Sequence, residues 1–250
     1  MTLVVFPKKI AMLLAVVIVG LIGGHIFTQY MFYGHGHDYQ FGFLRLFDLG
    51  GENNISSWFA SFTLLACSFL LALIGLTKKR SHDRHAFHWL VLAGIFLYLS
   101  LDEAASIHEM IEMLIPADRA TGYLFYPWVI AGGLFVFIVS MAFFRFLVAL
   151  PSDTRRLFII AGILYVGGAL GIELVGAKHD FHYGKENLVY AMLVMVEEGL
   201  EMAGVATFLY ALSSYMATHA IGVHFVMSSA QLEKRRRNVD KNLLSRSSAT

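Results

Sequence analysis

The sequence is poor in charged residues and almost without cysteine. Only 15% of its 250 residues are charged and 57% are hydrophobic, with a mean hydropathy of +0.63. This composition excludes an ordinary soluble domain and indicates a polytopic membrane protein. The single cysteine, Cys67, excludes a disulfide within the chain and disfavours a thiolate-bound metal such as copper(I). The net charge of +1 argues against nucleic acid as a partner.

Long apolar runs dominate what is present. Six of them reach the roughly 20 residues that an α-helix needs to cross a bilayer. They are Ile10–Phe32, Ser57–Leu76, Phe87–Ile115, Leu124–Leu147, Leu157–Ala177 and Leu188–Ala217. Their connections are polar and mostly short, without a long linker or a repeat. We therefore predict an all-α, six-helix transmembrane bundle that forms one domain over residues 1–227.

Basic residues near the ends of these runs predict the orientation in the membrane. They precede the first run, follow the second, separate the fourth from the fifth, and follow the sixth. The positions are Lys8, Lys9, Lys78, Lys79, Arg80, Arg84, Arg145, Arg155, Arg156, Lys234, Arg235, Arg236 and Arg237. By the positive-inside rule this side is the cytoplasm, so both termini are expected there. Residues 228–250 are predicted to form a basic, flexible cytoplasmic tail.

Acidic residues interrupt the apolar runs at places where a carboxylate in hydrocarbon is costly and usually functional. The third run and the sixth run carry most of them, and the fifth carries Glu173. The set is Asp102, Glu103, Glu109, Glu112, Glu173, Glu197, Glu198 and Glu201, with His108 among the acids of the third run. At a rise of about 1.5 Å per residue, all of them fall in overlapping layers of the outer half of the membrane.

The helical repeat predicts which of these side chains share a face. Glu197, Glu198 and Glu201 fall within an arc of about 100° on the sixth helix. On a continuous third helix, Asp102 and Glu109 lie within about 60°, whereas Glu103 points away from them. The runs contain no lysine or arginine at this depth, so salt bridges cannot neutralise the acids. Protons or divalent cations must do so instead.

The spacing of the acids favours a metal site. Glu109-x-x-Glu112 and Glu198-x-x-Glu201 resemble the spacing in helical-bundle di-metal sites, although those sites pair glutamate with histidine. We predict that His108, Glu109, Glu112, Glu197, Glu198 and Glu201 hold one or two divalent transition metal ions, either zinc, iron or manganese. Asp102, Glu173 and Glu52 are expected as further ligands or as groups that orient the ligands. Additional imidazoles would have to come from His25, His179 or His182.

Other functions remain open. A metal site would suit a hydrolase or a di-iron oxidoreductase acting on a lipid or a quinone, and the sequence does not choose between them. A proton- or cation-coupled transporter could use the acids as a relay, and a protonated network could simply pack the bundle. Below Glu201 the sixth run offers few polar side chains, namely Thr207, Tyr210, Ser213 and Ser214. A relay across the membrane would need more, so the sequence favours a one-sided site.

The acidic motifs also carry a resemblance. Three stretches contribute to it, and they are Phe47-Asp48-Leu49 with Glu52-Asn53 and Trp58-Phe59, Leu99–Glu103 with His108-Glu109, and Glu197-Glu198 with Glu201. Together they resemble a group of uncharacterised bacterial multi-spanning membrane proteins. The resemblance implies a bacterial inner membrane and draws attention to Glu52. It implies no activity. Membrane lipid is the partner expected of a membrane-spanning bundle.

Overall fold

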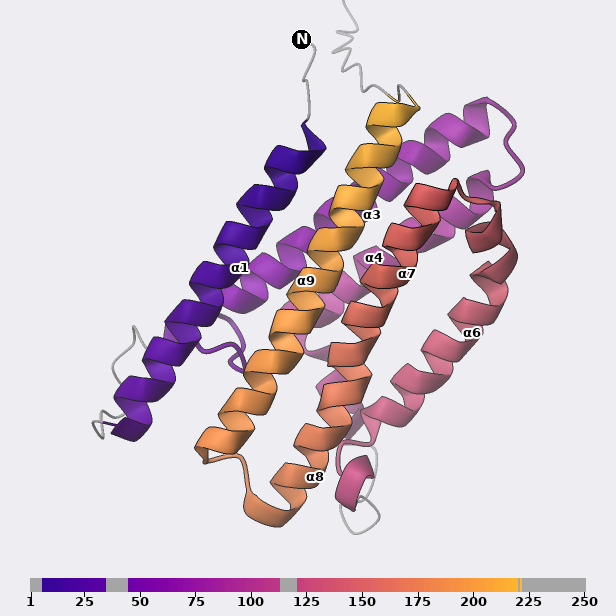
Figure 1. Ribbon diagram of the computed structural model, residues 1–250. Coiled ribbons are helices and arrows are strands. Elements are labelled where there is room, and N and C mark those ends of the chain that lie inside the picture. Colours follow the sequence, from indigo (N-terminus) through magenta and orange to yellow (C-terminus); the bar gives the residue numbers. More distant parts are fainter. Residues whose placement is uncertain (1–5, 35–44, 113–120, 220, 222–250) are drawn as a thin grey trace, which may run out of the picture. The chain divides into compact units, whose positions relative to one another are not determined.

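The computed structural model describes residues 6–34, 45–112, 121–219 and 221, and every regular element in these ranges is helical. Figure 1 shows the elements α1 (Pro7–Gln29), η1 (Tyr30–Gly34), α3 (Ile55–Arg80), α4 (Ala86–Ala105), α5 (Ile107–Glu112), η3 (Gly122–Leu124), α6 (Trp128–Ala149), α7 (Ser152–Val166), η4 (Gly167–Ile172), α8 (Glu173–Tyr183) and α9 (Leu188–Thr218). All of them belong to one compact unit, Val5–Ile221. The predicted all-helical fold is confirmed, while the predicted tail at 228–250 lies outside the described residues.

Five helical segments are long and apolar enough to cross a membrane. They are Pro7–Gly34, Ile55–Arg80, Ala86–Ala105, Trp128–Ala149 and Ser152–Tyr183. The sixth predicted helix, α9, has 31 residues, which span about 46 Å, but its three glutamates lower its hydropathy. Figure 1 shows that α1 begins and α9 ends at the same end of the helices. The chain thus has five to six helices of membrane-spanning character.

The predicted third helix is broken near its C-terminal end. α4 ends at Ala105, Ser106 adopts a left-handed conformation with φ 48° and ψ 46°, and α5 starts at Ile107. Asp102 stabilises the break, because its Oδ1 accepts a 2.8 Å hydrogen bond from the backbone N–H of His108 at the start of α5. The prediction of one continuous helix over 87–115, with Asp102 and Glu109 on one face, is therefore wrong beyond Ala105.

Two glycines allow α9 to touch the neighbouring helical segment backbone to backbone. A Cβ atom at Gly168 in η4 would lie 2.7 Å from the Glu197 carbonyl oxygen and 2.9 Å from Glu201 Cγ. A Cβ atom at Gly204 would lie 2.7 Å from the backbone nitrogen of Tyr165 in α7. Small residues of this kind let helices approach closely in membranes. The contact brings the glutamates of α9 against the segment that leads into Glu173.

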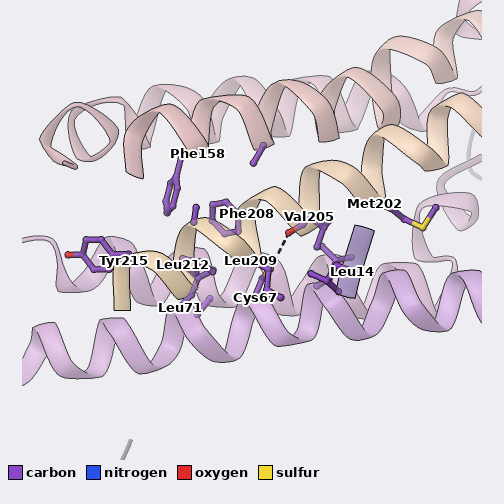
Figure 2. Close-up of a cluster of buried hydrophobic side chains, with 14 of the residues drawn as sticks. Leu14, Cys67, Leu71, Phe158, Met202, Val205, Phe208, Leu209, Leu212 and Tyr215 are labelled. Carbon is purple, nitrogen blue, oxygen red and sulfur yellow. Dashed lines mark hydrogen bonds between the residues drawn. The ribbon is translucent and has the colours of Figure 1, made fainter. Parts of the chain in front are cut away.

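An apolar core fills the half of the helices away from these glutamates. Figure 2 shows its α9 side chains, which are Met202, Val205, Phe208, Leu209, Leu212 and Tyr215, packed against Leu14, Cys67, Leu71 and Phe158. Cys67 is fully buried, and its thiol donates to the Val205 carbonyl oxygen at 3.9 Å. Such close burial of apolar side chains is typical of a protein interior. α9 is therefore acidic in its first half and part of the core in its second half.

Candidate functional site

A polar cavity of about 580 Å³ lies where α1 ends and α9 begins. Its lining comes from α1, η1, α5, α6, α8 and α9 and from the segments that precede α3, α6 and α9. The chemically distinctive ones are His25, Tyr33, Asp48, His108, Tyr126, Trp128, Glu173, Lys185, Glu186, Tyr190, Glu197 and Glu198. Its volume falls within the roughly 300–1,000 Å³ range of small-molecule sites. The structure therefore brings the predicted residues His108, Glu173, Glu197 and Glu198 to one cavity.

The cavity carries an excess of negative charge. Its lining includes the carboxylates Asp48, Glu173, Glu186, Glu197 and Glu198. Among the described lining residues, Lys185 is the one lysine or arginine, and it comes from the loop before α9 rather than from a membrane-spanning run. Its Nζ lies 4.0 Å from Asp180 Oδ2 and its side chain is 60% exposed, so this ion pair is weak. Protons or a bound cation must balance most of the remaining charge.

Asp102 and His108 form an oriented pair at the break between α4 and α5. Asp102 Oδ2 lies 3.1 Å from His108 Nδ1, in addition to the bond from its Oδ1 to the His108 backbone. A carboxylate in this position favours the imidazole tautomer that carries its proton on Nδ1 and its lone pair on Nε2. This geometry suits Asp102 to orienting the imidazole.

A chain of contacts connects this pair to the glutamates on the other side of the cavity. The His108 ring lies 4.9 Å from the Trp128 ring, and Trp128 Nε1–H donates to Glu173 Oε1 at 3.1 Å. Glu173 lines the cavity together with Glu197 of α9. Residues of α5, α6, α8 and α9 are thus joined around one acidic centre.

Glu103 lies on the face of α4 that packs against α9. Phe96, seven residues earlier and therefore on the same face, stacks on Phe208 of α9. The sequence analysis placed Glu103 on a sector of its own helix that points away from the other acids, and this sector faces α9. No signal within one helix could show that, because the rotation of one helix relative to another is set by packing.

Glu52 and the α5 glutamates occupy different positions from the cavity glutamates. The exposed Glu52 accepts a hydrogen bond from the Ser106 hydroxyl group, so it ties the loop before α3 to the α4–α5 break. It is not part of the described cavity lining. Glu109 and Glu112 belong to α5, but their side chains lie outside the described structure. Their predicted role as ligands stays a prediction.

Two of the other histidines proposed as ligands are engaged elsewhere. His25 is 1% exposed; its Nε2 lies 3.2 Å from the Ala191 carbonyl oxygen, and its Nδ1 accepts from the Leu49 backbone N–H at 3.0 Å. His25 therefore fastens α1 to α9 and to the loop before α3. His179 Nε2 lies 2.8 Å from Asn187 Oδ1, at the cap of α9. Both residues serve the fold at the wall of the site.

Two tyrosines and a lysine line the part of the cavity next to the start of α9. The Tyr126 hydroxyl group donates a 2.6 Å hydrogen bond to Asp180 Oδ2, and its oxygen lies 3.1 Å from the hydroxyl oxygen of Tyr190. Burial, followed by the bond to Asp180, raises the pKa of Tyr126, so its hydroxyl group stays a donor. Lys185 Nζ lies 4.9 Å from the centre of the Tyr126 ring. These residues lie in loops or at helix ends and carried no motif in the sequence.

The described side chains do not form a complete metal site by themselves. Within residues 6–34, 45–108 and 121–219, no three His, Cys, Asp or Glu side chains are arranged to hold an ion. What the described site offers is one oriented imidazole and the carboxyl groups of Asp48, Glu173, Glu186, Glu197 and Glu198 around a cavity.

By its fold and its cavity the chain is a helical protein with several apolar helices of membrane-spanning length and an acidic cavity between them. Residues 10–215 match the model of a domain of unknown function (DUF8692), and the chain belongs to this family. No curated protein and no solved structure matches the chain significantly.

Proposed function

We propose that this chain is an integral protein of the bacterial inner membrane that crosses it six times, with both termini in the cytoplasm. The basic residues in the last turn of α3 and those at the start of α1 and α7 support this orientation. The start of α1 and the end of α9 at one end of the helices agree with an even number of crossings (Figure 1). In this orientation the cavity opens to the outer side.

We further propose that the cavity binds one or two divalent transition metal ions. The observation that carries this proposal is the Asp102–His108 pair, which faces a surplus of carboxylates across the cavity. Histidines that bind metals usually have their second ring nitrogen held by a carboxylate in this way. His108 Nε2, Glu173 and Glu197 would supply ligands, and Glu109 and Glu112 would add ligands from α5. Mixed imidazole and carboxylate donors suit zinc, iron or manganese.

The apolar core argues for a site with access from one side. Directly beyond Glu201, the α9 side chains Met202 and Val205 are buried, and Phe208, Leu209 and Leu212 continue the core. A proton or cation relay needs closely spaced polar groups, and this stretch presents packed hydrocarbon instead. The transporter alternative stays a prediction that flux measurements can decide.

An enzymatic role would use the same residues. A metal bound there would supply a Lewis acid that lowers the pKa of a bound water, or an iron pair able to oxidise a lipid or a quinone. The chain would orient His108 through Asp102. Membrane lipid would reach the cavity from the outer leaflet.

Metal content tests the proposal directly. Protein purified in detergent without added metal is expected to contain one or two transition metal ions per chain by elemental analysis. Glu197→Gln combined with His108→Ala should remove most of the metal, because it removes two ligands from opposite walls. Asp153→Asn is the matched control, since Asp153 is an exposed acid in the first turn of α7, at the far end of that segment. A wild-type protein that contains no metal and whose melting temperature does not change when a chelator is added would refute the metal site. Ion flux in proteoliposomes that is lost in Glu197→Gln would establish the transporter.

A further inference from the structure

The cavity is much larger than a metal site requires. Its volume of about 580 Å³ leaves room for an organic molecule beside His108 and Glu173. The proposed metal ligands His108, Glu173 and Glu197 account for one part of the lining and leave Tyr126, Tyr190 and Glu186 without a role. If the cavity opens to the outer side, as the proposed function has it, a molecule of a particular chemical class can enter this space from outside.

The charge of the lining selects a cation. Five carboxylates face the cavity against the single ammonium group of Lys185, among the described lining residues. Glu186 and Glu173 lie on different segments, so carboxylates line the cavity on more than one side. An anionic or neutral polar ligand would gain nothing from this field, whereas a cation would.

Aromatic rings line the same space. Tyr33, Tyr126, Trp128 and Tyr190 contribute to the cavity. Aromatic rings attract ammonium groups through cation–π interactions, and cages of such rings recognise organic ammonium ions. A bare metal ion would use the carboxylates but would gain little from the rings. The combination of rings and carboxylates fits an organic ammonium ion better than any other ligand.

An ammonium group of the protein already occupies part of this environment. Lys185 Nζ lies 4.9 Å from the centre of the Tyr126 ring and 4.0 Å from Asp180 Oδ2, while 60% of its side chain stays exposed. Lys178 makes a similar contact outside the described lining, 4.5 Å from the centre of the Tyr123 ring. Lys185 is held loosely enough to be displaced, and its position marks where an external ammonium group would bind.

We propose that the outer part of the cavity binds an organic ammonium group, which displaces Lys185 from Tyr126 and lies among Tyr126, Tyr190 and Glu186. The ammonium group can belong to a free diamine or to an amino headgroup of a lipid. Both share the same chemistry at this site.

The experiment titrates the full-length protein in nanodiscs of phosphatidylglycerol, a lipid without an ammonium group, with putrescine. Calorimetry is expected to show saturable binding, and 1,4-butanediol, which lacks the charge, should not bind. Lys185→Gln should tighten putrescine binding at least threefold, because it removes the competing ammonium group. Lys178→Gln removes the same charge from a residue outside the described cavity lining. It should change the putrescine affinity less than half as much as Lys185→Gln does. Tyr126→Leu should weaken binding at least tenfold, and Tyr126→Phe, which keeps the ring, should not.

The lipid arm identifies the source of the ammonium group. If added phosphatidylethanolamine weakens putrescine binding, the natural ligand is a lipid headgroup; if it has no effect, the ligand is a free amine. Absence of putrescine binding, equal binding of butanediol, or equal effects of Lys185→Gln and Lys178→Gln would overturn the proposal. Metal content is measured on the same preparations. Putrescine binding by a metal-free protein would refute the metal site alone, and a metal-loaded protein without putrescine binding would refute only this inference.

Discussion

Gly204→Ala is expected to destabilise the protein strongly, with a lower melting temperature in detergent and a loss of about 1–3 kcal/mol in the free energy of unfolding. The added methyl group would lie 2.7 Å from the Tyr165 backbone nitrogen and 2.9 Å from the Ala161 carbonyl oxygen. Both obstacles are backbone atoms of α7, so no side-chain rotation can relieve them. α7 and α9 must separate, and that separation would also disturb the core around Phe158 and Phe208, whose rings lie 4.5 Å apart.

Gly199→Ala on the same helix provides the matched control. Its added methyl group would meet Ile22 Cδ1 at 3.6 Å, an ordinary van der Waals contact. Both substitutions have the same effect on helix propensity, which favours alanine. A melting temperature of Gly204→Ala equal to that of Gly199→Ala would show that α7 and α9 do not pack as closely as described.

Asp102→Asn is expected to weaken metal binding by about 10–100-fold, the usual effect of losing a carboxylate behind a metal-bound histidine. The substituted amide can still accept from the His108 backbone N–H through its oxygen, so the start of α5 should persist. Its NH₂ group, however, would face His108 Nδ1 and favour the tautomer with the proton on Nε2, where the metal would bind. Competition with a fluorescent chelator measures the change in affinity.

Asp102→Glu distinguishes orientation from simple folding in this experiment. The longer carboxylate can still reach the imidazole, so it should restore part of the affinity if Asp102 acts by holding the ring. Thermal unfolding of both variants monitors the α4–α5 break. A folded Asp102→Asn protein that binds metal as tightly as the wild type would remove Asp102 from the site.

The sequence predicted the helices well because their apolar runs are long and polar residues separate them. It placed the ends of most helices within a few residues, as with Ser57–Leu76 against α3 (Ile55–Arg80). The break at Ser106 was not predictable, because neither glycine nor proline marks it. A serine in the left-handed region is unfavourable on its own. Asp102, Glu52 and the packing around them hold it there, and such tertiary contacts leave no local pattern.

The site was predicted in part. Glu173, Glu197, Glu198 and His108 do face one cavity, since acids inside apolar runs are rare enough to stand out. The cavity residues from loops and helix ends, such as Tyr126 and Lys185, were missed because their positions depend on how the loops pack. His25 was treated as an available ligand, yet both of its ring nitrogens are used within the fold. Only the packed structure shows that.

The π-helical segment η4 has a consequence for how α7 and α8 can evolve. Each residue of an α-helix advances the direction of its side chain by about 100°, and a π-helical turn inserts one extra residue into that sequence. An uninterrupted α-helix through Gly167–Ile172, one residue shorter, would turn Glu173 by about 100° relative to Phe158. The inserted residue changes the side-chain direction of α8 relative to α7. The core-facing side of α7 and the direction of Glu173 at the start of α8 can therefore change independently of each other during evolution.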